Sequence, residues 1–362
     1  MLDQSINQSI NQSINQSINN SNRKYYIGLD LLKIIAMFMV TILHTLGHGG
    51  IVWNGSLTGI NYDVAWLLEI MSFCAVNCYA MISGYVGINS QIKYYKLIYF
   101  WLQLVFSGLL IAFLCSIFQP EWVNVNIWKD AIFPIYRKEY WYMTAYFGLF
   151  LLLPIINAGI NSLLSQQRKI LFYTISLFLI ILPYFAGQDL FFIVNGYSLM
   201  WLLFCYIIGA LLAKENLFIN QSKTALFFIY LFAVLITAYL KKYQNIDWVT
   251  YSSPTILFCG ISLVVLFSKI EFKTLWLIKT IKYVASLTLG VYIFHENPLI
   301  REHYVSGISI GYFNLDTISF VLAILGIAST IFVCGIIFDA CRKWIFDKLD
   351  VANRLAKLPY LS

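Results

Sequence analysis

The sequence predicts an all-α polytopic membrane protein with about ten transmembrane helices. Hydrophobic residues form 60% of the 362-residue chain and charged residues form 11%, whereas soluble domains carry roughly 45–50% apolar and about 25% charged residues. The apolar residues gather in runs, and a helix needs about 20 such residues to cross the hydrocarbon core of a bilayer. The formal charge of +7 comes from basic residues in the connections between runs, which fits membrane orientation better than a nucleic-acid partner.

Ten apolar runs are predicted to be spans. The first run lacks the basic region and the small-residue cleavage site of a secretory signal, so it is expected to remain as a span. The seven cysteines lie in or at the ends of runs, without a CxxC pair, and we interpret them as reduced packing residues. The predicted spans are, in chain order, roughly 29–48, 64–88, 97–118, 141–160, 170–187, 198–213, 224–240, 251–268, 283–300 and 318–341.

The distribution of Lys and Arg predicts that both termini are cytoplasmic. Seventeen of the 24 basic residues fall in one alternating set of connections and tails, and six fall in the other set. Cytoplasmic loops are enriched in these residues. The chain is therefore expected to comprise a low-complexity cytoplasmic tail (1–24), a ten-span membrane domain (25–345) and a short basic cytoplasmic tail (346–362).

Residues 4–19 repeat the tetrapeptide QSIN four times. Polar low-complexity sequence of this kind is usually disordered. The tetranucleotide CAAT, repeated three times, encodes Gln-Ser-Ile-Asn. We hypothesise that the tail is a translated tetranucleotide tract, in which gain or loss of one unit shifts the reading frame and causes phase variation. The nucleotide sequence of the gene tests this hypothesis, because a tract interrupted by synonymous codons would remove it.

The first predicted span contains two ionisable residues, Lys33 and His44. They are eleven residues apart, which at about 100° per residue returns them to nearly the same helix face, about 16 Å apart along the axis. Lys33 is expected near the cytoplasmic end and His44 in the outer third. The lysine either snorkels to the headgroups or binds an anion. The histidine either makes an interhelical hydrogen bond or acts as a general base.

Three further titratable residues are expected at the depth of His44. Glu69 lies in the second predicted span, and His295 and Glu296 lie in the ninth. Titratable groups are costly in lipid, so these residues are expected to face a bundle interior or a wet cavity. His48 follows His44 by four residues, as in a helical metal pair, but no third ligand is evident and no metal is expected.

Five segments, in their order and spacing, form a pattern that extends over nearly the whole chain. They are YYIGLDLLKIIAMFMVTILHTLGHG (25–49), NCYAMISGYVG (77–87), YWYMTAYFGLFLLLPIIN (140–157), YSLMWLLFCYIIGALL (197–212) and LGVYIFHENPLI (289–300). This pattern resembles that of the acyltransferase 3 family of bacterial ten-span membrane O-acyltransferases. In that family a basic residue on the first helix is followed by ten residues and then a histidine, a spacing that Lys33 and His44 match.

The resemblance implies transfer of an acyl group, usually acetyl from acetyl-CoA, to a hydroxyl of a surface glycan such as lipopolysaccharide or capsule, or of its lipid-linked precursor. Lys33, helped by Lys93 and Lys96 on the same side, would bind the phosphates of CoA. His44 would act as general base, with a carboxylate at similar depth to orient its ring. The expected catalytic set is His44, Glu69, His295 and Glu296.

Aromatic residues in the outer connection 119–140 and at the start of the next span leave two interpretations open. They either stack on sugar rings or form the aromatic belt at the headgroup level. These residues are Trp122, Trp128, Tyr136, Tyr140 and Trp141.

The sequence thus predicts a multi-pass enzyme of a bacterial inner membrane. Its expected partners are acyl-CoA, a surface carbohydrate and membrane lipids, without nucleic acid. The alternative is a transporter, or a flippase or exporter, of an envelope polysaccharide or lipid, for which ten spans and buried charges would also be natural.

Overall fold

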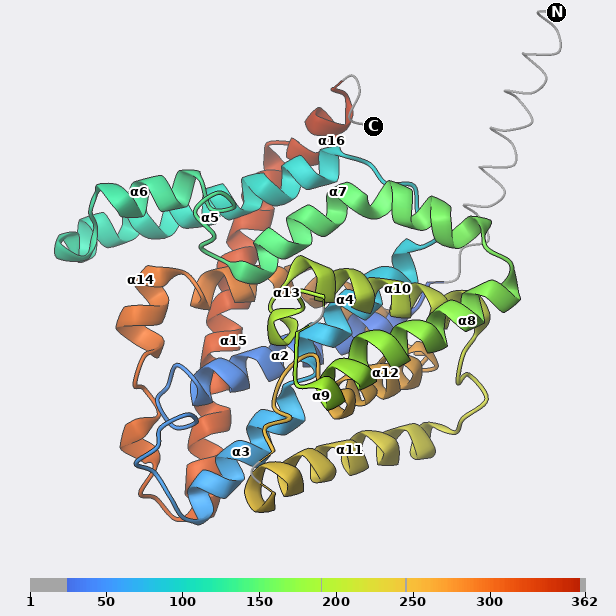
Figure 1. The fold of residues 1–362 in the computed structure, drawn as a ribbon. Helices are drawn as coiled ribbons and strands as arrows, with labels where there is room; N and C mark the ends of the chain where they lie inside the picture. The colour runs from blue at the N-terminus through green and yellow to red at the C-terminus, as the bar shows by residue number, and fades with distance from the viewer. Residues whose placement is uncertain (1–24, 190, 245, 359–362) are drawn as a thin grey trace, which may run out of the picture.

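Helices account for all the regular secondary structure of residues 25–189, 191–244 and 246–358, which are the residues described by this computed structural model (Figure 1). The predicted QSIN tail lies outside the described residues. The α-helices are α2 (Ile27–Leu46), α3 (Ile60–Ser72), α4 (Ala75–Gly87), α5 (Tyr95–Phe118), α6 (Val125–Ile132), α7 (Trp141–Ser162), α8 (Ser165–Ile175), α9 (Leu182–Ala186), α10 (Leu199–Glu215), α11 (Lys223–Tyr243), α12 (Pro254–Ser268), α13 (Leu275–His295), α14 (Pro298–Ile300), α15 (Thr317–Lys348) and α16 (Val351–Ala356).

Each of the ten predicted spans falls on helical segments, although the helices differ in length. Among the described residues, seven helical stretches are long and apolar enough to cross a membrane, and α3 and α4 together form one of them, Ile60–Gly87. The helices α10 and α12 have only 17 and 15 residues. The fifth predicted span is composed of α8, a π-helical segment (Ser176–Ile181) and α9. A membrane protein is therefore supported, whereas the count of ten spans and the cytoplasmic termini remain predictions.

The last long helix differs from its predicted bounds. The helix α15 continues to Lys348, past the expected end of the span at 341. Its C-terminal part carries a buried ion pair between Asp339 and Arg342, with Nε–Oδ1 and Nη2–Oδ2 distances of 2.8 Å. Because both charges have hydrogen-bond partners inside the protein, the helix extends through this polar region without exposing them to lipid.

The Asp339–Arg342 pair also joins α15 to two neighbouring helices. Gln103 of α5 donates a hydrogen bond to Asp339 Oδ1 over 3.2 Å, and Arg342 Nη1 lies 3.0 Å from the hydroxyl of Tyr99. On α13, a Cβ at Gly290 would overlap the Asp339 side chain. Only glycine at this position permits α13 to approach the buried carboxylate.

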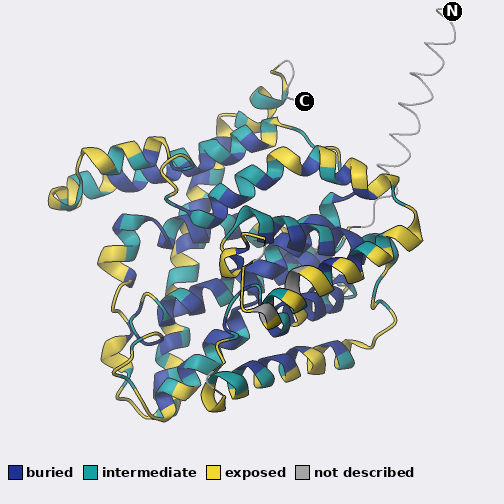
Figure 2. Ribbon diagram, viewed as in Figure 1, coloured by how far each residue is buried: buried dark blue, intermediate teal, exposed yellow. Residues whose placement is uncertain are grey.

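The helices α4 and α10 form the centre of the core. Figure 2 shows buried residues along these helices and exposed residues along α8 and α11. A Cβ at Gly84 would overlap the carbonyl oxygen of Tyr206, and a Cβ at Gly209 would overlap that of Met81. Gly84 of α4 faces α10 and Gly209 of α10 faces α4. The two backbones can therefore pack closely, as small residues allow in membrane bundles.

Asn77 ties this core to the end of the bundle that contains His44. Its side chain is fully buried. Its Nδ2 donates to the carbonyl oxygen of Tyr251 over 2.8 Å, and its Oδ1 accepts from Trp201 Nε1 over 2.8 Å. One amide thus connects α4 to α10 and to the segment that precedes α12, and it satisfies groups that would be costly to bury unpaired.

Candidate active site

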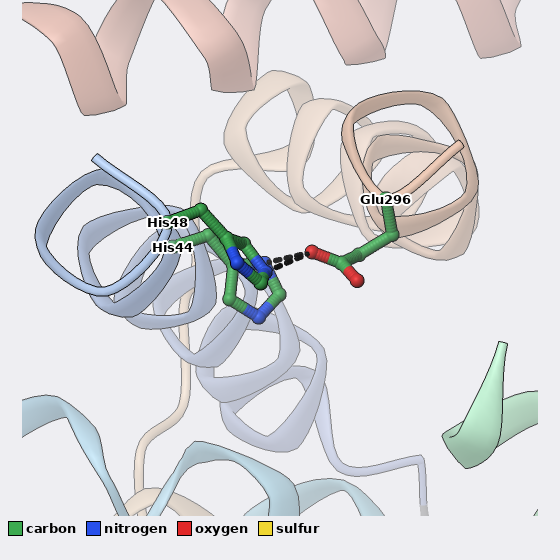
Figure 3. A group of neighbouring side chains, drawn as sticks. All are labelled: His44, His48 and Glu296. Atoms are coloured by element: carbon green, nitrogen blue, oxygen red, sulfur yellow. Dashed lines mark hydrogen bonds and ion pairs between the residues drawn. The ribbon is translucent and has the colours of Figure 1, made fainter. Parts of the chain in front are cut away.

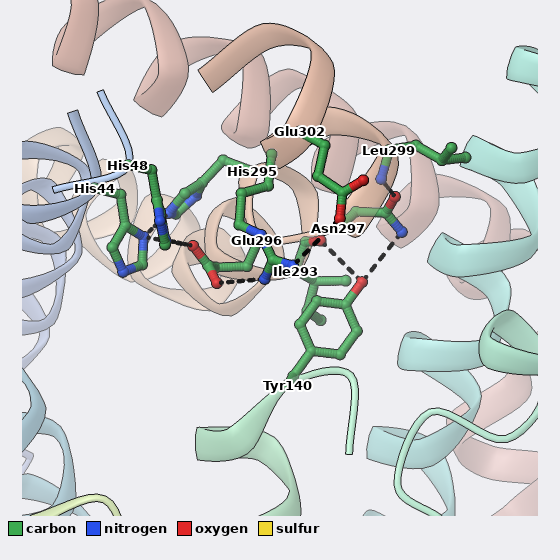
Figure 4. A network of polar contacts seen from close by, with 10 residues as sticks. His44, His48, Tyr140, Ile293, His295, Glu296, Asn297, Leu299 and Glu302 are labelled. Atoms are coloured by element: carbon green, nitrogen blue, oxygen red, sulfur yellow. Dashed lines mark hydrogen bonds and ion pairs between the residues drawn. The ribbon is translucent and has the colours of Figure 1, made fainter. Parts of the chain in front are cut away.

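The C-terminal ends of α2 and α13 meet and bring His44, His295 and Glu296 together. His44 lies in the last turn of α2, His295 is the last residue of α13, and Glu296 is its C-cap. The Nδ1 atom of His44 lies 2.7 Å from Nε2 of His295 and 3.0 Å from Oε1 of Glu296 (Figure 4). Three of the four expected catalytic residues therefore form one cluster.

The partners of His295 determine the tautomer of His44. His295 Nδ1 lies 2.6 Å from the carbonyl oxygen of Val291, and a carbonyl oxygen only accepts, so this nitrogen carries the proton. Nε2 of neutral His295 is then an acceptor, and His44 Nδ1 must donate to it or to Glu296. The Nε2 atom of neutral His44 is left with its lone pair available, and in Figure 4 this second nitrogen points away from His295 and Glu296.

A small aromatic pocket adjoins His44. Its volume is about 30 Å³, which is space for roughly two water molecules. A thioester and an attacking alcohol need more room, so their binding requires the lining side chains to move. The lining includes His44, Tyr79, Trp141, Tyr142, Tyr251 and Tyr292, together with aliphatic residues and methionines.

Glu296 is the carboxylate that lies next to His44 in the structure. Its side chain is only 9% exposed. Oε1 also accepts from Nε2 of His48 over 2.9 Å, and Oε2 lies 3.5 Å from the guanidinium of Arg301. With these partners the carboxylate can hold the His44 ring in place and stabilise it when it becomes protonated.

His44, His48 and Glu296 are also arranged as a metal site would be. Figure 3 shows the three side chains converging, and one ligand atom from each lies within 4.8 Å of the other two. The sequence showed no third ligand beside His44 and His48. In the structure, Glu296 takes that place. However, Nδ1 of His44 also lies 2.7 Å from Nε2 of His295, and the guanidinium of Arg301, 3.5 Å from Oε2, opposes a divalent cation nearby. We therefore interpret the trio as a hydrogen-bonded group.

Glu69, the fourth expected catalytic residue, lies elsewhere. It is 3% exposed, and its Oε2 has no hydrogen-bond partner among the described residues. The cation that acts on its carboxylate is Lys241 of α11. The sequence predicted similar depths for Glu69 and Glu296, and of these two carboxylates the structure brings only Glu296 to His44.

The three lysines expected to bind the donor lie toward the opposite end of the bundle. Lys33 Nζ is 3.0 Å from Asp30 Oδ1, one turn earlier on α2, and its side chain is 30% exposed. Lys93 and Lys96 flank the start of α5, which follows the end of α4 after a short connection. The rings of Tyr26 and Tyr85 lie 5.2 Å apart and place that end of α4 beside the start of α2.

Most of the chain matches a known protein family. A model of the acyltransferase 3 family, described as an acyltransferase domain, matches residues 26–339. The chain belongs to this family. Nothing among the curated proteins and nothing among the solved structures matches it. The match includes α2 through most of α15, so the His44 cluster lies within the acyltransferase domain.

Two residues of this acyltransferase that the sequence analysis did not assign to the site fix the end of α13. The hydroxyl of Tyr140 donates to the carbonyl oxygen of Ile293 over 3.3 Å and accepts from Asn297 Nδ2 over 3.3 Å. Asn297 Oδ1 accepts from the backbone N–H of Leu299 over 3.1 Å. The Asn-Pro pair at 297–298 was the available signal, because Asn before Pro at the first helical position typically marks a helix start.

We predict that Glu296→Gln lowers kcat of the acyltransferase by on the order of 10²–10⁴-fold, because the amide does not stabilise a positive His44 ring. The measurement is acyl transfer by the purified variant in detergent. Glu302→Gln is the matched control, since the Glu302 side chain is 64% exposed and lies 3.8 Å from the guanidinium of Arg301. A kcat for Glu296→Gln equal to that of the control would contradict the assigned role of Glu296.

Proposed function

We propose that the protein transfers an acetyl group from acetyl-CoA to a hydroxyl of a cell-surface glycan or of its lipid-linked precursor. Membership of the acyltransferase 3 family supports acyl transfer at the general level. The observation that carries the proposal is the orientation of His44: its Nδ1 is engaged by His295 and Glu296, and its Nε2 is available beside an aromatic pocket.

The proposed reaction needs one base, which later acts as an acid. His44 Nε2 takes the proton of the acceptor hydroxyl while the oxygen attacks the thioester carbonyl carbon. The resulting tetrahedral intermediate collapses, the carbon–sulfur bond breaks and the ester forms. The thiolate of CoA receives the proton from the His44 imidazolium, which restores neutral His44. Glu296 stabilises the imidazolium between the two proton transfers.

On the donor side, the proposal assigns the phosphates of CoA to Lys33, with Lys93 and Lys96 as further cations. Lys33 is joined to Asp30, so a phosphate would exchange with or share this partner. The hydroxyl of Tyr79 donates to the carbonyl oxygen of Lys33 over 2.7 Å, and Tyr79 also lines the His44 pocket. The Tyr79 side chain thus contacts both the backbone of Lys33, where the donor phosphates are proposed to bind, and the pocket of His44, where the reaction is proposed to occur.

The biological setting is part of the same proposal. We place the enzyme in a bacterial inner membrane, with lipopolysaccharide or capsule as the modified structure and with phase variation through the QSIN tract. Family membership favours this enzyme over the transporter or flippase that the sequence left as an alternative.

His44→Ala is predicted to abolish acyl transfer while leaving expression and membrane insertion intact, because the general base is removed. Ester-linked acetate on surface glycan is compared among cells without the gene, with the wild-type gene and with the variant. His303→Ala is the control, since the His303 ring stacks on Trp122, outside the cluster. Acetylation in the His44→Ala cells at the wild-type level would overturn the mechanism.

Lys33→Ala is predicted to raise KM for acetyl-CoA roughly tenfold, the effect of losing about 1.4 kcal/mol of charge-assisted binding. Lys33→Arg should be tolerated because it keeps the charge. Steady-state kinetics with varied acetyl-CoA distinguish the two, and KM for the glycan serves as the internal reference. If the Lys33→Ala variant and the wild type have the same KM for acetyl-CoA, Lys33 does not bind the donor and only extends its ammonium to the headgroups.

A further inference from the structure

A second, larger pocket lies between the N-terminal half of α3 and the C-terminal end of α11. Its volume is about 460 Å³, within the range of small-molecule sites. It lies at the same end of the bundle as His44, because α3 follows α2 in the opposite direction and begins where α2 has ended. We call it the α3–α11 groove, and the residues used below that line it are Trp53, Asp63, Trp66, Lys241, Lys242 and Asp247.

Two indole rings form the apolar part of the groove. Trp53 and Trp66 pack edge to face, with centroids 4.6 Å apart. The ammonium of Lys241 lies 3.7 Å from the Trp66 ring centroid and 4.9 Å from that of Trp53. Trp53 remains 56% exposed. The Lys241 ammonium thus lies over both rings, closer to Trp66, and the exposed part of Trp53 offers an apolar surface to a ligand.

The charged residues of the groove are paired and balanced. Lys242 Nζ lies 2.7 Å from Asp63 Oδ2, and Lys241 Nζ lies 3.4 Å from Asp247 Oδ1. Two ammonium groups and two carboxylates give both hydrogen-bond donors and acceptors with no net charge. This lining suits a ligand with many hydroxyls and an apolar ring face better than a polyanion such as CoA.

Glu69 of α3 precedes Ile70, which lines the groove. It lies one turn beyond Trp66 on α3, and its buried Oε2 has no hydrogen-bond partner among the described residues. Its carboxylate lies within electrostatic range of Lys241 in the groove and of Tyr251, and Tyr251 lines the pocket of His44. A buried acceptor without a donor is costly, and a hydroxyl of a bound ligand would supply that donor.

We propose that the α3–α11 groove binds a sugar residue of the acyl acceptor, with an apolar ring face on Trp53 and hydroxyls toward Asp63, Asp247 and Glu69. This inference rests on the proposed function and adds the recognition site for its acceptor. The alternative occupant is a lipid headgroup, since tryptophans also form interfacial belts. The paired charges of the groove favour the glycan, and so does Glu69 Oε2, which has no hydrogen-bond partner among the described residues.

The test uses the full chain in phosphatidylcholine nanodiscs, labelled acetyl-CoA, and unacetylated surface glycan extracted from cells that lack the gene. Trp53→Ala and Lys241→Gln are each expected to raise KM for the glycan roughly tenfold, with KM for acetyl-CoA unchanged, as loss of uniform acceptor binding requires. Trp276→Ala is the matched control, because Trp276 is 66% exposed at the start of α13. Glycan KM values within twofold of wild type for both groove variants would overturn the inference.

A binding measurement separates failure of the groove from failure of the proposed function. Without donor, the glycan is titrated against tryptophan fluorescence of the wild type and of Trp53→Phe, and a response present only in the wild type supports the groove. If the wild type transfers no acetyl group, the proposed function fails, yet this titration still tests the groove. Quenching of the Trp53 emission by brominated lipid, with no response to glycan, would identify a headgroup contact and refute the inference.

Discussion

The hydrogen bond between His44 and His295 is the contact on which the arrangement of the site depends. It joins the ends of two helices that are 251 residues apart in the chain, and it lies where unpaired imidazoles would be costly to bury. Because the Val291 carbonyl fixes the proton of His295 on Nδ1, the bond also fixes the proton of His44. The same contact thus sets the position of the His44 ring and the nitrogen that is left to act as a base.

The end of α13 is held from two other directions. Tyr140 and Asn297 bind the backbone around its last turn, and Gly290 lets the helix pack on the buried Asp339 of α15. Movement of α13 along its axis would break several buried polar contacts together. This restraint keeps Glu296 beside His44, and positioning at this precision is what a general base requires.

Sequence reasoning could identify Lys33 and His44 because both lie on one helix, where a 3.6-residue period fixes their relation. It could place Glu69 and Glu296 only by depth, since the side of a helix that meets another helix depends on packing between distant segments. The break between α3 and α4 near Phe73 and Cys74 carries no Gly or Pro, so the chain gave no local signal for it. By contrast, the glycine at position 84 of the segment NCYAMISGYVG (77–87) has a physical explanation, because it allows the backbone of α4 to reach α10.

The first helix also imposes a constraint on any donor. Between Lys33 and His44 the sequence IIAMFMVTIL contains neither Gly nor Pro, the usual causes of a kink, and α2 is one uninterrupted α-helix from Ile27 to Leu46. The two side chains are therefore held about 16 Å apart along the axis, with Tyr79 packed between them. A small anion at Lys33 could not touch His44. If both residues act on one substrate, as we propose, that substrate must have its charged groups and its reactive carbonyl at the two ends of a long flexible arm, and acyl-CoA is such a molecule.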